Sequence, residues 1–202
     1  MYVPILLFSS LEFSTVRIIR PKHNSFLYIH IIFPGGNITF ITNHKDFIMM
    51  TYKLEAILWS IALPGFAQLL NRQIIKGITF VFLEFLINVN SHFNMVILYS
   101  FQGNIKEAIE ATNYQWLMFY PCLYFFAMWD AYKDAKGGNS PYSYLPFVFG
   151  AYFVTVGLMY SSSFKLGTIL LGPVWLPILS LIPGLLIGYF IKNMLLRRIK
   201  IK

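Results

Sequence analysis

Long apolar runs separated by short polar connections make up most of the chain after residue 50. Five such runs lie at residues 54–70, 77–99, 114–131, 144–160 and 167–191. A helix rises about 1.5 Å per residue and a bilayer's hydrocarbon core is about 30 Å thick, so a span needs roughly 17–25 residues. We therefore predict an all-α, polytopic helical membrane protein with about five transmembrane helices. The first run is short enough to be re-entrant, and four spans would then remain.

Composition supports the membrane interpretation. Hydrophobic residues make up 57% of the 202 residues and charged residues only 12%, whereas about 25% of a soluble domain is charged. The net charge of +8 is not accompanied by a nucleic-acid-binding motif, so we expect no nucleic-acid partner. The single cysteine, Cys122, excludes an internal disulfide and has no second thiol for a metal site, so we expect it only to pack.

Lysine and arginine are distributed unevenly among the connections. Arg72 and Lys76 lie in the first connection and Lys133 and Lys136 in the third, whereas the fourth holds only Lys165. In the second connection one lysine is opposed by two glutamates, and the C-terminal tail after the last run is strongly basic. Because basic connections stay in the cytoplasm, we predict a multi-pass plasma-membrane protein with the first and third connections and the C-terminus cytoplasmic.

Residues 1–48 differ from the rest of the chain. They show no sustained period, although the alternation in "NITFIT" is strand-like. We expect a poorly structured N-terminal segment here, and Met49-Met50 is an alternative translation start that would exclude it. The remaining organisation is a kinked transmembrane hairpin at residues 49–100, followed at 101–202 by three further transmembrane helices and the basic tail.

The stretch "IALPGFAQLLNRQIIKG" interrupts the first apolar run. Pro64 removes a backbone donor and Gly65 adds flexibility, a break that lipid tolerates only where other groups satisfy the freed backbone. We predict a kinked helix, a tight turn at residues 71–73, and a close-packing point at Gly77 where the returning helix starts. Gln68 is then placed to hydrogen-bond the bent backbone or the other helix. Alternatively, the whole stretch is only packing and turn chemistry.

This stretch resembles the Pro-Gly-x-Gly-Gln-x-Tyr-x-Gly…Lys-Gly hairpin of small bacterial membrane proteins related to the two-transmembrane-helix domain, which also occurs near the start of some sugar ABC-transporter permeases. The matching positions are Pro64, Gly65, Gln68, Lys76 and Gly77; Ala67, Leu70 and Arg72 depart from the pattern. The segment "MWDAYKDA" is similar to the Trp-x-x-x-Asp ending of that family. As a whole, the chain resembles uncharacterised multi-pass membrane proteins of Gram-positive bacteria, which implies a membrane location and no established activity.

Polar residues recur within the second apolar run. Glu84, Asn88 and His92 follow a spacing that would place them on one face of a continuous helix. A charged group in mid-membrane costs about 2.5–3.5 kcal/mol on insertion scales and usually pairs or faces water. One hypothesis is a polar cleft that relays protons or holds a cation. The alternative is that Glu84 hydrogen-bonds another helix as a structural contact.

Two further patterns concern contacts. Asp130 and Asp134, one helical turn apart, form either a cytoplasmic docking site or an ordinary interfacial charge cluster. In the fifth run, the small residues of Gly184-x-x-x-Gly188 predict a close helix contact.

The sequence carries none of the common signatures of hydrolases, metalloproteases or nucleotide-binding enzymes. We therefore predict a protein that is not an enzyme, has no cofactor or metal, and acts through lipids, other membrane proteins or further copies of itself. The alternative function is a small transporter or ion-coupled carrier with Glu84 as the titrating group. A membrane-embedded enzyme, using Glu84, His92 and Asp130, is a third interpretation.

Overall fold

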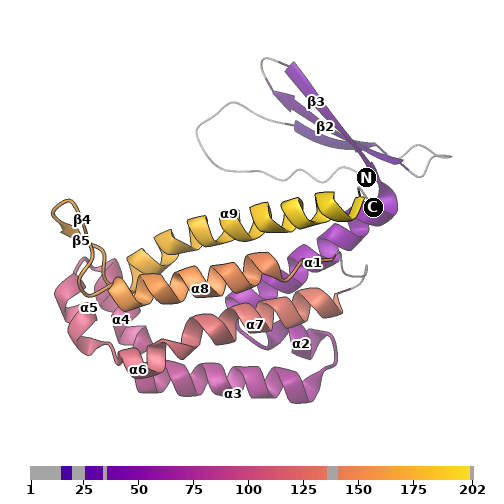
Figure 1. Ribbon diagram of the computed structural model, residues 1–202. Helices are drawn as coiled ribbons and strands as arrows, with labels where there is room; N and C mark the ends of the chain where they lie inside the picture. Colours follow the sequence, from indigo (N-terminus) through magenta and orange to yellow (C-terminus); the bar gives the residue numbers. More distant parts are fainter. Residues whose placement is uncertain (1–14, 20–25, 34–35, 136–140, 201–202) are drawn as a thin grey trace. The chain divides into compact units, whose positions relative to one another are not determined.

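A computed structural model describes residues 15–19, 26–33, 36–135 and 141–200 of the chain (Figure 1). It divides into two compact units, Met1–Lys53 and Leu54–Lys202. Strands occupy the described part of the first unit until a helix begins at its end, and the second unit is mostly helical. The predicted predominance of helix is therefore confirmed for the described residues.

The N-terminal unit contains an antiparallel meander. Its strands are β1 (Thr15–Ile19), β2 (Phe26–Phe33) and β3 (Gly36–Asn43), in the order β1-β2-β3. The alternating segment "NITFIT" lies within β3, where β-branched and aromatic residues favour a pleated strand. We expected little regular structure in residues 1–48. The described part of that segment is instead this meander and the start of α1 (His44–Ala62), which continues into the second unit.

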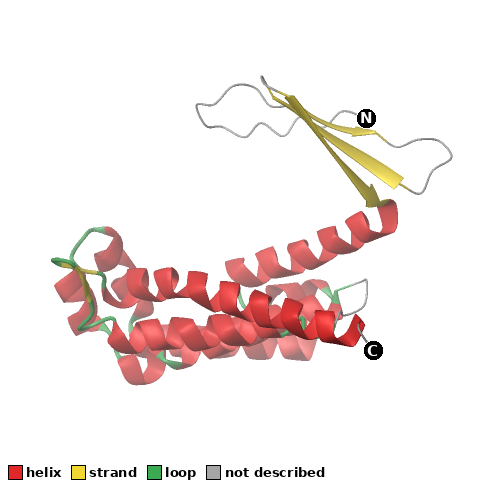
Figure 2. Ribbon diagram, turned by 45° about the horizontal axis from the view of Figure 1, so that its top comes forward, coloured by secondary structure: helices red, strands yellow, loops and turns green. Residues whose placement is uncertain are grey.

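The second unit consists of helices joined by short turns (Figure 2). After α1 come α2 (Phe66–Leu70), α3 (Ile74–Ser91), α4 (Phe93–Phe101), α5 (Ile105–Ala111), α6 (Tyr114–Leu117), α7 (Phe119–Asp134) and α8 (Leu145–Tyr160). A short hairpin of β4 (Lys165–Leu166) and β5 (Ile169–Leu170) then precedes α9 (Gly172–Lys200).

Three of the predicted runs are broken into separate helices, and in the third the break is a single residue, Met118, between α6 and α7. The first run is interrupted by a turn between α1 and α2, where Gly65 has a φ of 98°. The second run is divided at His92, whose φ of 57° places it in the left-handed region between α3 and α4. Hydropathy does not register these three breaks, because all of them lie inside apolar sequence.

Close backbone approach joins α8 to α9, which lie antiparallel and side by side (Figures 1 and 2). A β-carbon on Gly184 would stand 2.8 Å from the carbonyl oxygen of Phe149, and one on Gly188 would stand 2.7 Å from the Cα of Pro146. Neither position has room for a larger residue. The close helix contact predicted at Gly184-x-x-x-Gly188 is confirmed.

Among the described residues, two helices are long and apolar enough to cross a membrane. They are Ile74–Ser91, with a mean hydropathy of 1.4, and Gly172–Arg198, with a mean hydropathy of 2.1. The count of about five spans is not confirmed, because the breaks shorten the helices below the length of the runs. α7 and α8 have only 16 residues each, which corresponds to about 24 Å.

Candidate functional site

The Pro-Gly stretch folds into a compact helix-turn-helix. α2 begins directly after Gly65, and a tight turn follows in which Arg72 has a φ of 62°. The backbone N–H groups of Asn71 and Gln73 donate to the carbonyls of Ala67 and Gln68, at 3.0 and 2.9 Å. The predicted turn at residues 71–73 is present. The returning helix, α3, begins at Ile74 rather than at Gly77.

Gly65 and Gly77 bring the two arms of this hairpin into backbone contact. A β-carbon on Gly65 would lie 2.5 Å from the carbonyl oxygen of Gly77, and one on Gly77 would lie 3.0 Å from the carbonyl oxygen of Gly65. Pro64 and both glycines are buried. Gly65 also needs glycine for its positive φ. The close-packing point predicted at Gly77 is therefore present, three residues inside α3.

Gln68 connects the hairpin to a distant helix. Its side chain is only 1% exposed, and its amide Nε2 donates to the carbonyl oxygen of Ala127 at 2.9 Å and to Oδ2 of Asp130 at 3.2 Å. Both acceptors belong to α7. Buried amides need such partners because an unpaired polar group costs about 1–3 kcal/mol. The contact therefore fixes α2 against α7, whereas the sequence suggested a bond within the hairpin.

A lysine and two carboxylates complete the same contact. Lys76 Nζ lies 2.9 Å from Oδ1 of Asp130 and 3.2 Å from Oδ2 of Asp134. Gln73 Nε2 donates to Oδ2 of Asp134 at 2.7 Å. We call Gln68, Gln73, Lys76, Asp130 and Asp134 the hairpin cluster. It holds the start of α3 against the last two turns of α7.

The environment of Asp134 favours its ionised form. Partial burial alone would raise the pKa of this carboxyl, but hydrogen bonds from Gln73 and Lys76 outweigh it and hold the pKa below its ordinary value. Asp130 is the less exposed of the two carboxylates, with 14% of its side chain accessible against 25% for Asp134.

The structure thus unites two patterns that the sequence presented separately. Gln68 and Lys76 of the hairpin motif contact the carboxylates that we considered for docking, while Pro64, Gly65 and Gly77 shape the backbone around them. Both carboxylates are engaged by side chains of the chain itself. Sequence reasoning missed the contribution of Gln73, whose placement depends on the left-handed turn at Arg72.

The polar residues of the second run have separate partners. Glu84 Oε1 accepts a hydrogen bond from the Tyr120 hydroxyl at 3.4 Å. Asn88 Nδ2 donates to Oδ1 of Asn94 at 3.2 Å. His92, at the helix break, has its Nδ1 3.3 Å from the Ala111 carbonyl oxygen.

Within the described residues, Glu84 and His92 have separate hydrogen-bond partners, Tyr120 and Ala111, and do not pair with each other. Tyr124, whose ring stacks on that of Tyr120 with centroids 5.2 Å apart, donates to the carbonyl oxygen of Ile61. The Glu84 contact therefore joins α3 to α7. The hydrogen bond of Tyr124, a second tyrosine of α7, joins α7 to the end of α1.

Cys122 is exposed rather than packed, which corrects our expectation. It lies in an apolar groove of about 730 Å³ between α3 and the α6–α7 segment. The cysteine faces outward because neighbouring α7 positions, including Pro121, take the buried side of the helix. Within the described residues, no three histidine, cysteine or acidic side chains gather in an arrangement that could hold a metal ion.

Comparisons with protein-family models, with curated proteins and with solved structures found no match to this chain.

Proposed function

We propose that the chain is a multi-pass integral protein of the plasma membrane that acts through contacts with lipids or other membrane proteins. One observation carries the proposal. The two helices of the described residues that are long and apolar enough to cross a membrane, α3 and α9, have only 22% of their most apolar 18-residue segment buried, although the core helix of a soluble protein is mostly buried. Their exposed side chains include Ile75, Phe82, Phe85, Ile182, Leu186 and Phe190. A water-soluble monomer rarely exposes such continuous apolar surface.

Shorter helices accompany these two spans in the proposal. α7 and α8 pack in the same unit and carry exposed apolar residues such as Phe126 and Tyr152. A span of about 24 Å matches a thinned bilayer or one whose flanking residues extend to the interface. With the apolar end of α1, this arrangement gives about five membrane-embedded helices.

The charge distribution supports a cytoplasmic location for one end of the helical unit. The start of α3, the end of α7 and the end of α9 lie at that end (Figure 1). They carry Lys76, Lys133, Arg197 and Arg198. At the opposite end, α5 is acidic overall and the β4–β5 hairpin holds a single lysine. The excess of basic residues favours the cytoplasm for the first end.

The hairpin cluster lies at this proposed cytoplasmic end and fastens α2 and α3 to α7. Gln68 and Lys76 of the hairpin motif and Asp130 of the segment "MWDAYKDA" form one contact there. In this proposal the chain is not an enzyme. The cluster keeps the hairpin in place and leaves the apolar faces of the helices for partners.

A second candidate function is an ion-coupled carrier. It is favoured by the position of Glu84 inside the candidate span α3, where the hydroxyl of Tyr120 lies on its carboxylate. An ionisable group at membrane depth is a functional candidate by default. Glu84 and His92 have separate partners. A carrier site would therefore consist of Glu84 and the tyrosines of α7, without His92.

Cysteine accessibility tests the first proposal. In a Cys122→Ser background, single cysteines replace Arg72, in the first connection, and Ser162, after α8; both positions are exposed. We expect a membrane-impermeant maleimide to label the Ser162→Cys variant on intact cells and the Arg72→Cys variant only after lysis. Equal labelling of both on intact cells would overturn the topology. Release of the protein by alkaline carbonate would overturn integral membrane insertion.

A further inference from the structure

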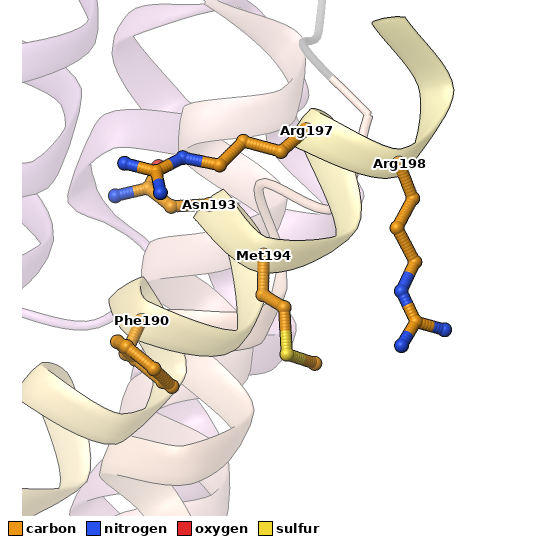
Figure 3. A pocket seen from close by; sticks show the side chains of 5 residues that line it. All are labelled: Phe190, Asn193, Met194, Arg197 and Arg198. Carbon is orange, nitrogen blue, oxygen red and sulfur yellow. The ribbon is translucent and has the colours of Figure 1, made fainter. Parts of the chain in front are cut away.

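The C-terminal part of α9 has a cavity on its surface that is built from apolar and basic side chains (Figure 3). The cavity measures about 350 Å³ and is lined by Phe190, Asn193, Met194, Arg197 and Arg198. The five residues are spaced at intervals that place them along one side of the helix. An apolar floor is therefore followed, within two turns, by two guanidinium groups.

The side chains divide this cavity into two parts. Figure 3 shows Arg197 extending beside Asn193 on the side of Phe190, whereas Arg198 extends on the other side, with Met194 between them. Phe190 is 69% exposed and Met194 41% exposed, which is unusual for side chains of their size in contact with water. No ion pair is found for either arginine within the described residues. Both the apolar floor and the two cations are thus open to a ligand.

Helix length places these parts at different depths. The apolar span Gly172–Arg198 has 27 residues, which corresponds to about 40 Å of helix. This exceeds the hydrocarbon core of about 30 Å by about 10 Å. If the span begins near Gly172, its last two turns emerge at the headgroup level, where Arg197 and Arg198 lie. Phe190 then lies at the boundary with the acyl chains.

We propose that this cavity binds one anionic phospholipid, with its anionic headgroup at the end that holds Arg197 and Arg198 and its acyl chain over Phe190 and Met194. The inference rests on the proposed membrane location and specifies a lipid class for it. Guanidinium groups bind phosphate oxygens through charge-assisted, often bidentate hydrogen bonds. The cytoplasmic leaflet supplies anionic lipid on the side that the basic residues favour. Asn193 adds an amide that can donate to the headgroup.

Native mass spectrometry of the full-length protein in detergent tests the proposal. The protein is titrated with phosphatidylglycerol or with phosphatidylcholine of the same acyl chains, and bound lipids are counted. The double variant Arg197→Gln/Arg198→Gln removes the cations of the cavity. The matched control Arg72→Gln/Lys106→Gln removes the same net charge at two exposed positions outside it. A Phe190→Ala variant removes the apolar floor.

We expect one phosphatidylglycerol to bind several-fold more tightly than phosphatidylcholine. A basic residue near anionic lipid contributes about 1 kcal/mol, so each arginine should account for about a fivefold change in affinity. The cavity variant, which lacks both arginines, should then bind about 25-fold more weakly, and the control less than twofold more weakly. Phe190→Ala should weaken the binding of the long-chain lipid and leave any binding of inorganic phosphate unchanged.

Three results would overturn the proposal. Equal losses in the cavity variant and the control would show a general charge effect, and full competition by millimolar inorganic phosphate would show an anion site without a lipid role. Unchanged lipid binding in the cavity variant, in a protein whose circular dichroism shows that its helices are retained, would exclude the two arginines as lipid ligands. None of these results would contradict integral membrane insertion. Release of the protein by alkaline carbonate is the separate result that would overturn the proposed function.

Discussion

Gly77 places its carbonyl oxygen 2.5 Å from the point where a β-carbon on Gly65 would stand. The same hypothetical carbon would lie 2.9 Å from the β-carbon of Phe80. Both neighbours are parts of α3 that cannot move without moving the helix. The two glycines therefore set the distance between the arms of the hairpin, and the polar side chains of the hairpin cluster depend on that distance.

Replacing Gly65 with alanine should destabilise the protein through two effects. A positive φ costs an L-residue about 1–2 kcal/mol, and crowding against backbone adds about 1–3 kcal/mol. Gly103→Ala is the matched control, because Gly103 has a φ of +82° with no atom within 4 Å of the hypothetical β-carbon. Thermal unfolding in detergent should show a larger drop in the midpoint for Gly65→Ala. Equal drops would mean that backbone strain alone explains the effect.

Removing the charge of Lys76 should loosen the contact between α3 and α7. Lys76 is half exposed, so the pair is screened by solvent, and we expect a loss of only about 0.2–1 kcal/mol in Lys76→Gln. Asp130→Asn should cost more, because Asp130 is less exposed and also accepts the amide of Gln68. Thermal unfolding midpoints provide the comparison, with Lys106→Gln as an exposed control. A larger effect at Lys106 than at Lys76 would contradict this account.

Asp134 predicts a specific dependence on pH. Its pKa is lower in the folded chain than the ordinary value of 3.8, so the contribution of the ionised carboxylate is complete above that value and is lost as the pH falls through the lowered folded pKa. The unfolding midpoint of Asp134→Asn relative to the unsubstituted protein measures this contribution. We expect a constant difference between pH 7 and pH 5, shrinking below about pH 4. A difference that grows on acidification would have the wrong sign.

The sequence predicted the helices better than their ends. Apolar runs located α3, α8 and α9, and small-residue spacing located the contact of Gly184 and Gly188 with α8. Runs could not reveal the break at His92, because a left-handed residue depends on the tertiary contacts on both sides of it. Here the ring of His92 meets the carbonyl of Ala111, 19 positions away. The same break removes the continuous face on which Glu84 and His92 were expected to meet.

The hairpin cluster shows a similar limit for the candidate site. Each half of it was visible in the sequence, the hairpin motif around Gln68 and the carboxylates Asp130 and Asp134. Their union was not, since 62 positions separate Gln68 from Asp130 and local periodicity carries no information at that range. Of the strands at residues 15–19, 26–33 and 36–43, the sequence suggested only the last, for a related reason. Short alternations such as "NITFIT" become a sheet only when β2 supplies a partner.

Glu84→Gln distinguishes a structural contact from proton transport. In the structure, Glu84 accepts from the Tyr120 hydroxyl, and a glutamine carbonyl can accept the same hydrogen bond. We therefore expect Glu84→Gln to unfold within about 0.5 kcal/mol of the unsubstituted protein, and Glu84→Leu to lose about 1–3 kcal/mol because the hydroxyl is left unpaired. Tyr120→Phe is the partner control and should lessen the effect of Glu84→Leu. Thermal unfolding in detergent compares the unsubstituted protein with the three single variants and with the double variant Glu84→Leu/Tyr120→Phe.

The same variant is then reconstituted into liposomes that contain a pH-sensitive dye. With an imposed membrane potential, a structural Glu84 predicts equal proton permeability for the unsubstituted protein and Glu84→Gln, because a neutral amide preserves the contact with Tyr120. A carrier that loads protons on this carboxylate predicts the opposite, since glutamine has no titrating group. Proton flux that the unsubstituted protein supports and Glu84→Gln abolishes would therefore replace the structural role with the ion-coupled one.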